Sequence, residues 1–301
     1  EVEMADYTSQ EEYDAATTDA VARKQEYGEQ RTDTTRAFLR TVTPLLRTGQ
    51  AQWDLGVLYS TNELTLPVLL PGPVANNQLY QIRTLDSILG FRYGVTDRLQ
   101  WNGSTQVGWQ NTQVTDGLTL TRDNAGGIGD LKTGFNYLLY RETECRPAVI
   151  ASFDLTAPTG NGRNPIAPGN AGMGLGVWTF ASDILMVKAY DPLVLFWGAG
   201  YRHYAEGRFG ANYIKPGDSF QYNFGTGFGV NERVTLSAAL LGSYALETQL
   251  NSQSLAGTNA DIISLRLAAT MIKRCNIVEP FVNFGITDRA PDATLGVVWT
   301  W

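Results

Sequence analysis

The sequence predicts an all-β protein: a transmembrane antiparallel β-barrel of about 12 strands, with a short N-terminal helical segment. Three observations predict this fold class. Most of the chain alternates apolar residues with small or polar ones at the two-residue period of a strand. No run of about 18 apolar residues occurs, so the sequence offers no helical membrane span. The net charge of −7 is confined to the beginning of the chain.

The N-terminal segment differs in charge from everything that follows it. Residues 1–30 hold nine acids against Arg23 and Lys24, a net charge of −7, whereas residues 31–301 hold 21 acids and 21 bases. We therefore expect an acidic helical segment over residues 1–50 and a barrel over residues 51–301. Neither region has the basic field that a nucleic-acid partner requires.

Within the first 50 residues, apolar positions from Thr34 to Leu46 recur near helical spacing, and Pro44 and Gly49 limit how far that helix runs. A disordered acidic tail is an equally good interpretation of residues 1–20.

Strand-like alternation begins at Gln52 and continues to the end of the chain. Its clearest case runs from Leu99 to Gln110, where Trp101, Val107 and Trp109 share one face and polar or small residues occupy the other. Successive side chains of a strand point to opposite faces, so each strand has one apolar and one small or polar side.

The choice between a soluble β-sandwich and a membrane barrel depends on which side faces water. Many alternating runs span 10–16 residues, longer than the usual globular strand of about 5–6 residues. The polar face is rich in Gly, Ser, Thr, Asn and Gln, which suits a watery lumen. Several strands end in aromatic residues, as the interfacial girdles of barrels do: Tyr59, Trp101, Trp109, Tyr137, Tyr201, Tyr244, Trp299 and Trp301.

The connections predict the orientation. The expected strands are 51–60, 78–94, 98–115, 126–140, 147–157, 172–189, 192–205, 218–231, 233–249, 259–273, 276–287 and 292–301. Short links alternate with longer ones near 61–77, 116–125, 158–171, 206–217 and 250–258. Short periplasmic turns and long outer loops are typical of bacterial outer-membrane barrels, and an even strand count places both chain ends in the periplasm.

Several segments carry a family resemblance. Gly127–Gly134 reads GIGDLKTG and leads into YLLY at 137–140, 153–160 reads FDLTAPTG, and 285–292 reads GITDRAPD. The chain over about residues 45–301 resembles the outer-membrane channels of the phenol-degradation meta-pathway family and the related functional-amyloid (Fap) secretion channel. The resemblance implies a twelve-stranded channel whose preceding helix plugs the pore, with a coiled coil further upstream that makes trimers. The expected plug residues are Phe38, Leu39, Val42, Leu45 and Leu46.

The candidate functional residues are the ionisable side chains expected to line the lumen: Asp54, Asp86, Arg92, Asp130, Lys132, Asp154, Arg202 and Arg266. Two interpretations stay open: a polar lining that selects what passes, or a salt-bridged filling that stabilises a narrow barrel. Asp130 and Lys132 share a face and are candidate partners of Arg202 or Arg266. We favour a structural role for Asp130 at the entry to its strand.

The sequence offers no catalytic or metal centre. His203 is the single histidine, at the outer end of a strand, so neither a metal site nor a Ser–His–Asp triad is expected, and we expect no cofactor and no enzymatic activity. Cys145 and Cys275 lie in turns six strands apart, too far for the Cα separation of about 7 Å that a disulfide allows, so we expect no bond between them.

The sequence therefore predicts an outer-membrane channel or transporter, gated by the N-terminal segment. It would pass small apolar or aromatic solutes or an exported polypeptide. The alternative is a structural or anchoring barrel with a closed lumen and a periplasmic arm that binds a partner. Expected partners are outer-membrane lipid and lipopolysaccharide, the transported molecule, and further copies of the chain in a trimer.

Overall fold

The computed structural model describes residues 45–69, 75–115, 120–162, 171–231, 233–273 and 276–301. Of the helical segment predicted over residues 1–50, residues 1–44 lie outside these ranges. Residues 45–50 are described and form no helix, with a turn at Thr48 and Gly49. No helix in the described ranges is long and apolar enough to cross a membrane.

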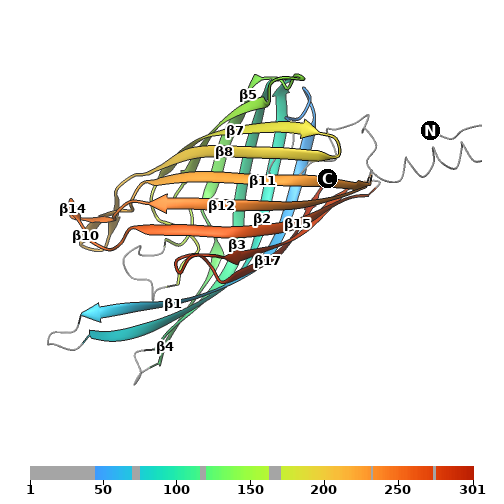
Figure 1. Ribbon diagram of the computed structural model, residues 1–301. Coiled ribbons are helices and arrows are strands. Elements are labelled where there is room, and N and C mark those ends of the chain that lie inside the picture. Colours follow the sequence, from blue (N-terminus) through green and yellow to red (C-terminus); the bar gives the residue numbers. More distant parts are fainter. Residues whose placement is uncertain (1–44, 70–74, 116–119, 163–170, 232, 274–275) are drawn as a thin grey trace, which may run out of the picture.

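The architecture is a closed antiparallel β-barrel (Figure 1). Its sheet contains thirteen strands, of which twelve close the ring and β4 is appended to β3. The ring closes because β1 pairs with β17 while β2 pairs with both β1 and β3. The twelve strands are β1 (Ala51–Leu69), β2 (Ala75–Thr96), β3 (Leu99–Thr115), β5 (Leu131–Tyr140), β6 (Ala148–Ala157), β7 (Thr179–Tyr190), β8 (Leu193–Tyr204), β11 (Ser219–Asn231), β12 (Val234–Ala245), β15 (Ala260–Ile272), β16 (Ile277–Gly285) and β17 (Ala293–Thr300). The predicted all-β, twelve-stranded fold is confirmed.

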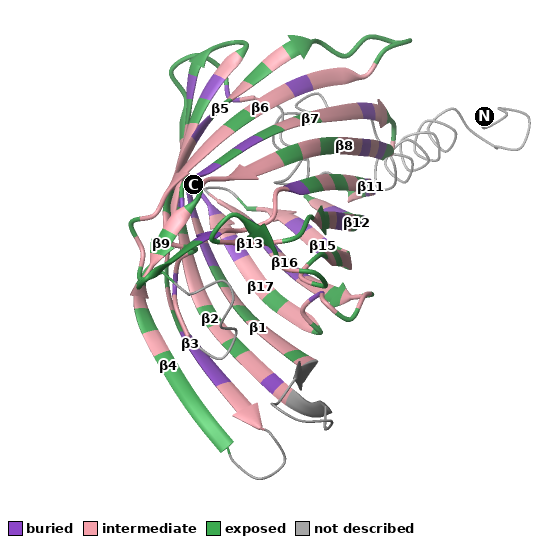
Figure 2. Ribbon diagram, turned by 90° about the vertical axis from the view of Figure 1, so that its left-hand side faces the viewer, coloured by how far each residue is buried: buried purple, intermediate pink, exposed green. Residues whose placement is uncertain are grey.

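Each strand turns its apolar face outward. On β1, Trp53 is 61% exposed while the next residue, Asp54, is 5% exposed. Along the other strands, residues of higher and lower exposure also alternate, as the colours in Figure 2 show. The described part of the barrel has small interior apolar clusters, such as Phe196 with Ala239, in place of one continuous core.

An aromatic row crosses the outer surface near one rim. The Trp53 and Phe91 rings lie 4.5 Å apart, and the Phe91 and Trp101 rings 5.6 Å apart, on three neighbouring strands. Such a row is suited to a membrane–water interface.

The expected strand over residues 126–140 is wrong, because the chain breaks there into two strands. β4 (Leu120–Ile128) pairs with the distal half of β3, whereas β5 pairs with the proximal half of β3 and with β6. The break falls at Gly129 and Asp130, where the Asp130 side chain bonds to a neighbouring loop and the backbone leaves the β3 ladder.

Other strand ends also differ from those expected. The hairpin of β1 and β2 extends to Leu69 and Ala75, through most of the loop expected at 61–77, and β4 begins inside the loop expected at 116–125. The strand expected at 172–189 begins only at Thr179, because residues 171–178 fold away from the wall. In the loops expected at 206–217 and 250–258, a small sheet forms from β9 (Gly207–Phe209), β10 (Asn212–Lys215), β13 (Gln249–Leu250) and β14 (Gln253–Ser254).

Candidate functional site: the polar lumen

One charged cluster lies on the inner wall where β1, β2, β15, β16 and β17 meet. Asp54 is bound by the Arg92 guanidinium at 3.2 Å and accepts a 2.5 Å hydrogen bond from the Thr300 hydroxyl. These partners stand on adjacent strands at the same or diagonal positions of the ladder. A buried charge is tolerated when it is paired and hydrogen-bonded, and Asp54 is both.

The Glu279 carboxylate is held in the same way. It is 2% exposed, accepts from Arg266 at 2.9 Å, and accepts from the Thr270 hydroxyl at 3.0 Å. The Arg266 guanidinium also lies 3.7 Å from the centre of the Phe281 ring, a cation–π distance. This region of the wall is closely packed and its charges are compensated.

A second charged cluster lies on β5, β6 and β8. The Lys132 ammonium is 2.9 Å from the Asp154 carboxylate, and the Arg202 guanidinium donates to the side-chain amide of Gln221. Lys132 remains 41% exposed at its side chain, so this pair is open to lumen water. The expected pairing of Asp130 and Lys132 with Arg202 or Arg266 is wrong: Arg202 faces Gln221, and Arg266 faces Glu279.

The segment of residues 171–178, called the lumen strap below, folds into the barrel instead of continuing β7. Gly172 and Ala171 donate their amides to Gln110 and Asp123, at 3.2 and 2.9 Å. Gln106 donates its side-chain amide to the Met173 carbonyl at 2.9 Å. These bonds hold the strap against the inner faces of β3 and β4.

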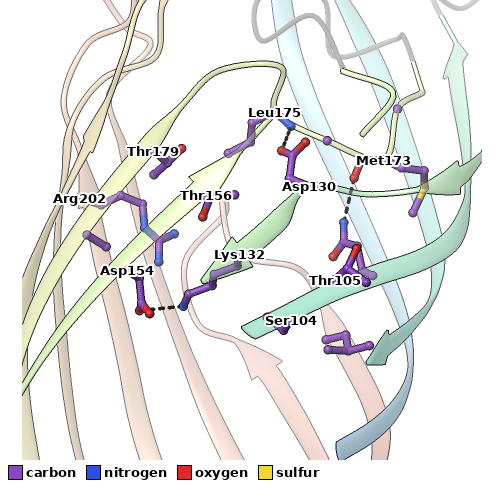
Figure 3. Close-up of a pocket in the computed structure, with 15 residues that line it drawn as sticks. Ser104, Thr105, Asp130, Lys132, Asp154, Thr156, Met173, Leu175, Thr179 and Arg202 are labelled. Atoms are coloured by element: carbon purple, nitrogen blue, oxygen red, sulfur yellow. Dashed lines mark hydrogen bonds and ion pairs between the residues drawn. The ribbon is translucent and has the colours of Figure 1, made fainter. Parts of the chain in front are cut away.

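Asp130 anchors the strap from the opposite side. One carboxylate oxygen accepts from the Leu175 amide at 2.8 Å and the other accepts from the Gly160 amide at 3.0 Å. Gly174 is needed here, because a β-carbon at that position would overlap the Asp130 carboxylate. Figure 3 shows Asp130 turned toward Leu175, with Lys132 and Asp154 facing each other across the adjacent strands.

Between the strap and the second charged cluster lies a cavity of about 400 Å³. Four of the predicted lumen residues line it: Asp130, Lys132, Asp154 and Arg202. The apolar side comes from Met173, Leu175, Ile88 and Ala181. The cavity therefore combines a charged wall with an apolar one.

The remaining predicted lumen residues lie outside this cavity. Asp54, Arg92 and Arg266 belong to the first charged cluster. Asp86 lies beneath the strap: a β-carbon built on Gly108 would overlap the Asp86 carboxylate and lie 2.7 Å from the Met173 Cε.

The chain leading into β1 lies against the inner wall at the other end of the barrel. Leu46 is 3% exposed and donates its amide to the buried Gln100 side chain at 3.0 Å. The Thr48 hydroxyl and amide donate to Asp97, and these two bonds hold the pKa of that carboxyl below its ordinary value. Of the expected plug residues, Leu45 and Leu46 are described, while Phe38, Leu39 and Val42 lie outside the described residues.

At the rim opposite the start of β1, Asp218 joins β8 to the chain entering β11. It accepts from the Tyr201 hydroxyl at 2.7 Å, from the Tyr204 amide at 3.0 Å, and contacts His203 Nδ1 at 3.0 Å. His203 thus contacts Asp218 and helps to hold the chain entering β11 against the end of β8. In the described ranges no three His, Cys, Asp or Glu side chains gather as a metal site would need.

Cys145 is free and exposed, and Cys275 lies outside the described residues.

Sequence reasoning missed Met173, Gln106 and Gln110 as lumen residues. The two glutamines were placed on the polar face of β3, but nothing local indicated that they would bind a segment more than sixty residues away. The available signal was the spacing of Gly172, Gly174 and Gly176, which allows close approach to a neighbouring wall.

A family model described as a putative MetA-pathway of phenol degradation matches residues 75–273. Among solved structures, the COG4313 outer membrane channel from Pseudomonas putida F1 is 17% identical, with 90% of this chain and 99% of that chain covered and a TM-score of 0.67. This likeness supports the same barrel fold.

Two further structures are less similar. The Pseudomonas putida toluene transporter TodX is 11% identical, with 92% and 96% of the two chains covered and a TM-score of 0.44. The translocator domain of the autotransporter NalP from Neisseria meningitidis is 10% identical, with 96% of each chain covered and a TM-score of 0.46.

Proposed function

The chain belongs to the family described as a putative MetA-pathway of phenol degradation, and from this premise we propose that it is an outer-membrane channel for small apolar or aromatic solutes. The observation that carries the proposal is the 400 Å³ cavity between the lumen strap and the second charged cluster. That volume is in the range of about 300–1,000 Å³ typical of small-ligand sites.

The cavity lining favours a solute with an apolar body and a polar edge. Met173 and Leu175 offer apolar contact on the strap, and Lys132 and Asp154 offer hydrogen bonds on the wall. Because these two charges neutralise each other, the wall can bind a polar substituent without demanding a charged one. An aromatic ring with one polar group fits this combination.

The strap argues against the other cargo that the sequence left open. An exported polypeptide would need the strap to leave the lumen, which breaks its bonds to Asp130, Gln106, Gln110 and Asp123. A small solute needs only the cavity beside it. We therefore favour solute passage over polypeptide secretion.

The roles of six of the eight predicted lumen residues follow from the cluster to which each belongs. Asp54 with Arg92, and Arg266 with Glu279, stabilise the closely packed side of the wall. Lys132, Asp154 and Arg202 stand at the cavity and would select what passes. Selection and wall stabilisation are thus divided between the two clusters.

Gating by the N-terminal segment is the second part of the proposal. Leu46 is buried against Gln100 on the inner face of β3, which supports a plug that continues from this point. Phe38, Leu39, Val42, Leu45 and Leu46 would then form an apolar plug. Because the start of β1 pairs with the end of β17, we place this rim in the periplasm and the loops carrying β10 and β14, at the opposite end in Figure 1, outside the cell.

The experiment is solute flux and single-channel conductance of the purified chain in lipid bilayers. Deleting residues 1–46 should raise the conductance, and liposomes should take up phenol faster than a sugar such as glucose. Unchanged conductance on deletion would remove the plug. No conductance and no uptake from either protein would favour the alternative, an anchoring barrel with a closed lumen and a partner-binding periplasmic arm.

A further inference from the structure

The outer surface of β1–β4 changes character at one level of the sheet. Up to Tyr59 on β1, Leu85 on β2 and Trp109 on β3, outward side chains are mainly apolar, and these three are direct ladder neighbours. On β2 the apolar face runs from Tyr93 to Leu85, a length of about 26 Å at about 3.3 Å per residue step. A strand tilt of about 40° reduces this to about 20 Å, comparable with the apolar band of about 25 Å of membrane barrels.

One level further out, the same face becomes polar on every strand. Thr61, Arg83, Asn111 and Asn124 are successive ladder partners from β1 to β4. The next level reads Glu63, Gln81, Gln113 and Arg122. Arginine on the lipid face of a barrel becomes tolerable only near the interface. This polar band therefore stands at the headgroup level of one leaflet.

The centre of the band is a ladder of amides. Asn111 donates its side-chain amide to Asn124 at 2.7 Å, and Gln113 donates to Asn111 at 3.2 Å. Mutual hydrogen bonds fix the orientation of these side chains on a rigid sheet. Asn111 is itself buried and uses both ends of its amide within the ladder, so the groups that can bind hydroxyls are the amide nitrogen of Asn124 and the amide oxygen of Gln113.

Two arginines flank the ladder without partners. Arg83 on β2 and Arg122 on β4 are exposed, and within the described residues neither side chain takes part in a hydrogen bond or an ion pair. The arginines of the inner wall, Arg92, Arg202 and Arg266, each have one. The nearest acid of the band, Glu63, accepts from Gln81 at 3.3 Å.

The spacing of the two arginines is set by the sheet. They lie two strands and two residues apart. With strands about 4.8 Å apart and a rise of about 3.3 Å per residue, their β-carbons are roughly 12 Å apart. Two guanidinium groups at that spacing, with amides between them, match a ligand that carries two anionic groups on a hydroxyl-rich frame.

We propose that Arg83, Asn111, Gln113, Arg122 and Asn124, the arginine platform, bind the phosphorylated sugar headgroup of lipopolysaccharide in the outer leaflet. Guanidinium groups bind phosphate through paired N–H donors. The amide ladder would bind sugar hydroxyls between them, and Leu85 and Trp109 immediately below would contact the acyl chains. The inference rests on the orientation given under the proposed function, which places this rim outside the cell.

The test is lipid A binding to the full chain in detergent, by native mass spectrometry and fluorescence titration. The variant is Arg83→Gln with Arg122→Gln, and the matched control is Arg98→Gln with Arg233→Gln, two exposed arginines in turns at the opposite rim. Each lost arginine–phosphate contact should weaken binding by about 10-fold, about 1.4 kcal/mol. The platform variant should bind bisphosphorylated lipid A at least 10-fold more weakly, and the control should bind as the parent does.

Further probes identify the ligand. Monophosphoryl lipid A should bind the parent more weakly, and phosphatidylglycerol should bind weakly to parent and variant alike. Equal binding of lipid A by parent and platform variant would overturn the proposal. So would phosphatidylglycerol binding that matches lipid A, because it would mean that any anionic headgroup suffices.

Conductance in bilayers free of lipopolysaccharide separates this proposal from the channel proposal. The platform variant should conduct as the parent does. A parent that conducts but binds lipid A no better than the platform variant would contradict the platform alone. Lipid A binding that depends on the platform, without conductance of the parent, would contradict the channel alone.

Discussion

Asp130 offers the sharpest perturbation of the proposed channel, because a single side chain holds the lumen strap from one side. Replacing it with alanine removes the acceptors of the Leu175 and Gly160 amides, at 2.8 and 3.0 Å, and leaves the Gln106 and Gln110 contacts in place. Asp130→Ala should therefore loosen the strap without removing it from the barrel.

The size of the effect follows from the bond that Asp130 makes to the strap itself, the one from the Leu175 amide, because Gly160 lies outside residues 171–178. A hydrogen bond to a charged group contributes about 1.5–3 kcal/mol, and because lumen water can replace the carboxylate as acceptor, the lower limit of about 1.5 kcal/mol applies. That energy shifts the ratio of seated to released strap by roughly 13-fold. A strap seated about 99% of the time would then be seated about 88% of the time.

The assay is single-channel recording of the chain without residues 1–46, so that the plug does not mask the strap. Asp130→Ala should show frequent transitions to a higher conductance level that is rare in the parent. Asp130→Asn keeps one acceptor oxygen and should lie between the two. Asp288→Ala, an exposed acid in the link between β16 and β17, removes the same charge and should leave the recording unchanged.

A parent-like recording from Asp130→Ala, together with parent-like resistance of residues 158–178 to protease, would refute the reasoning, because the strap would then be held without its anchor.

Three further perturbations test other parts of the molecule. Glu279→Ala leaves the Arg266 guanidinium buried without its carboxylate and should lower the free energy of unfolding by about 3–5 kcal/mol in urea titrations in detergent; a loss under about 1 kcal/mol would mean that the pair is not buried in solution. Gly94→Ala places a methyl group against the Arg47 carbonyl, and 2.7 Å from that of Leu46, so it should release the chain before β1 to protease; Gly103→Ala, with 3.8 Å of clearance, is the control and should not. Burial raises the pKa of Asp218, but its bonds to Tyr201, Tyr204 and His203 outweigh burial and lower that pKa below 3.8. A carboxyl whose pKa is lower in the folded than in the unfolded protein stabilises the fold at pH values above its unfolded-state pKa. That stabilisation is lost as the pH falls through its folded-state pKa. The chain that joins β8 to β11 should therefore loosen only below about pH 3.8, as seen by hydrogen exchange, and Asp218→Asn should abolish that pH dependence.

The strand faces were predictable from sequence because they are a local property. The alternation of apolar Trp53 with charged Asp54 already assigns one side of the strand to lipid and the other to the lumen, and pairing with the next strand keeps each side in place. Strand number followed in the same way, since each apolar run ends in a polar or Pro/Gly-containing link.

The lumen strap was not predictable, because Gly172 to Val177 alternates small and apolar residues as a strand would. What removes it from the wall is Asp130, a partner 45 residues away in sequence that outcompetes the ladder for the Leu175 amide. The predicted partners of Asp130 and Lys132 were wrong for a related reason. Sharing a face makes Asp130 and Arg202 possible partners, but the register decides which groups come within 4 Å, and it brings Lys132 to Asp154 instead.

The central claim is that the apolar face of the barrel lies in hydrocarbon and the polar face lines a wet lumen. Nitroxide labels at single cysteines, in a chain with Cys145→Ser and Cys275→Ser, measure this directly through their collision rates with oxygen and with a water-soluble nickel chelate. The account predicts that labels at Leu89 and Leu236 collide mainly with oxygen, and that labels at Gln106 and Thr156, beside the cavity, collide mainly with the chelate. Chelate-accessible labels at Leu89 and Leu236 would contradict it.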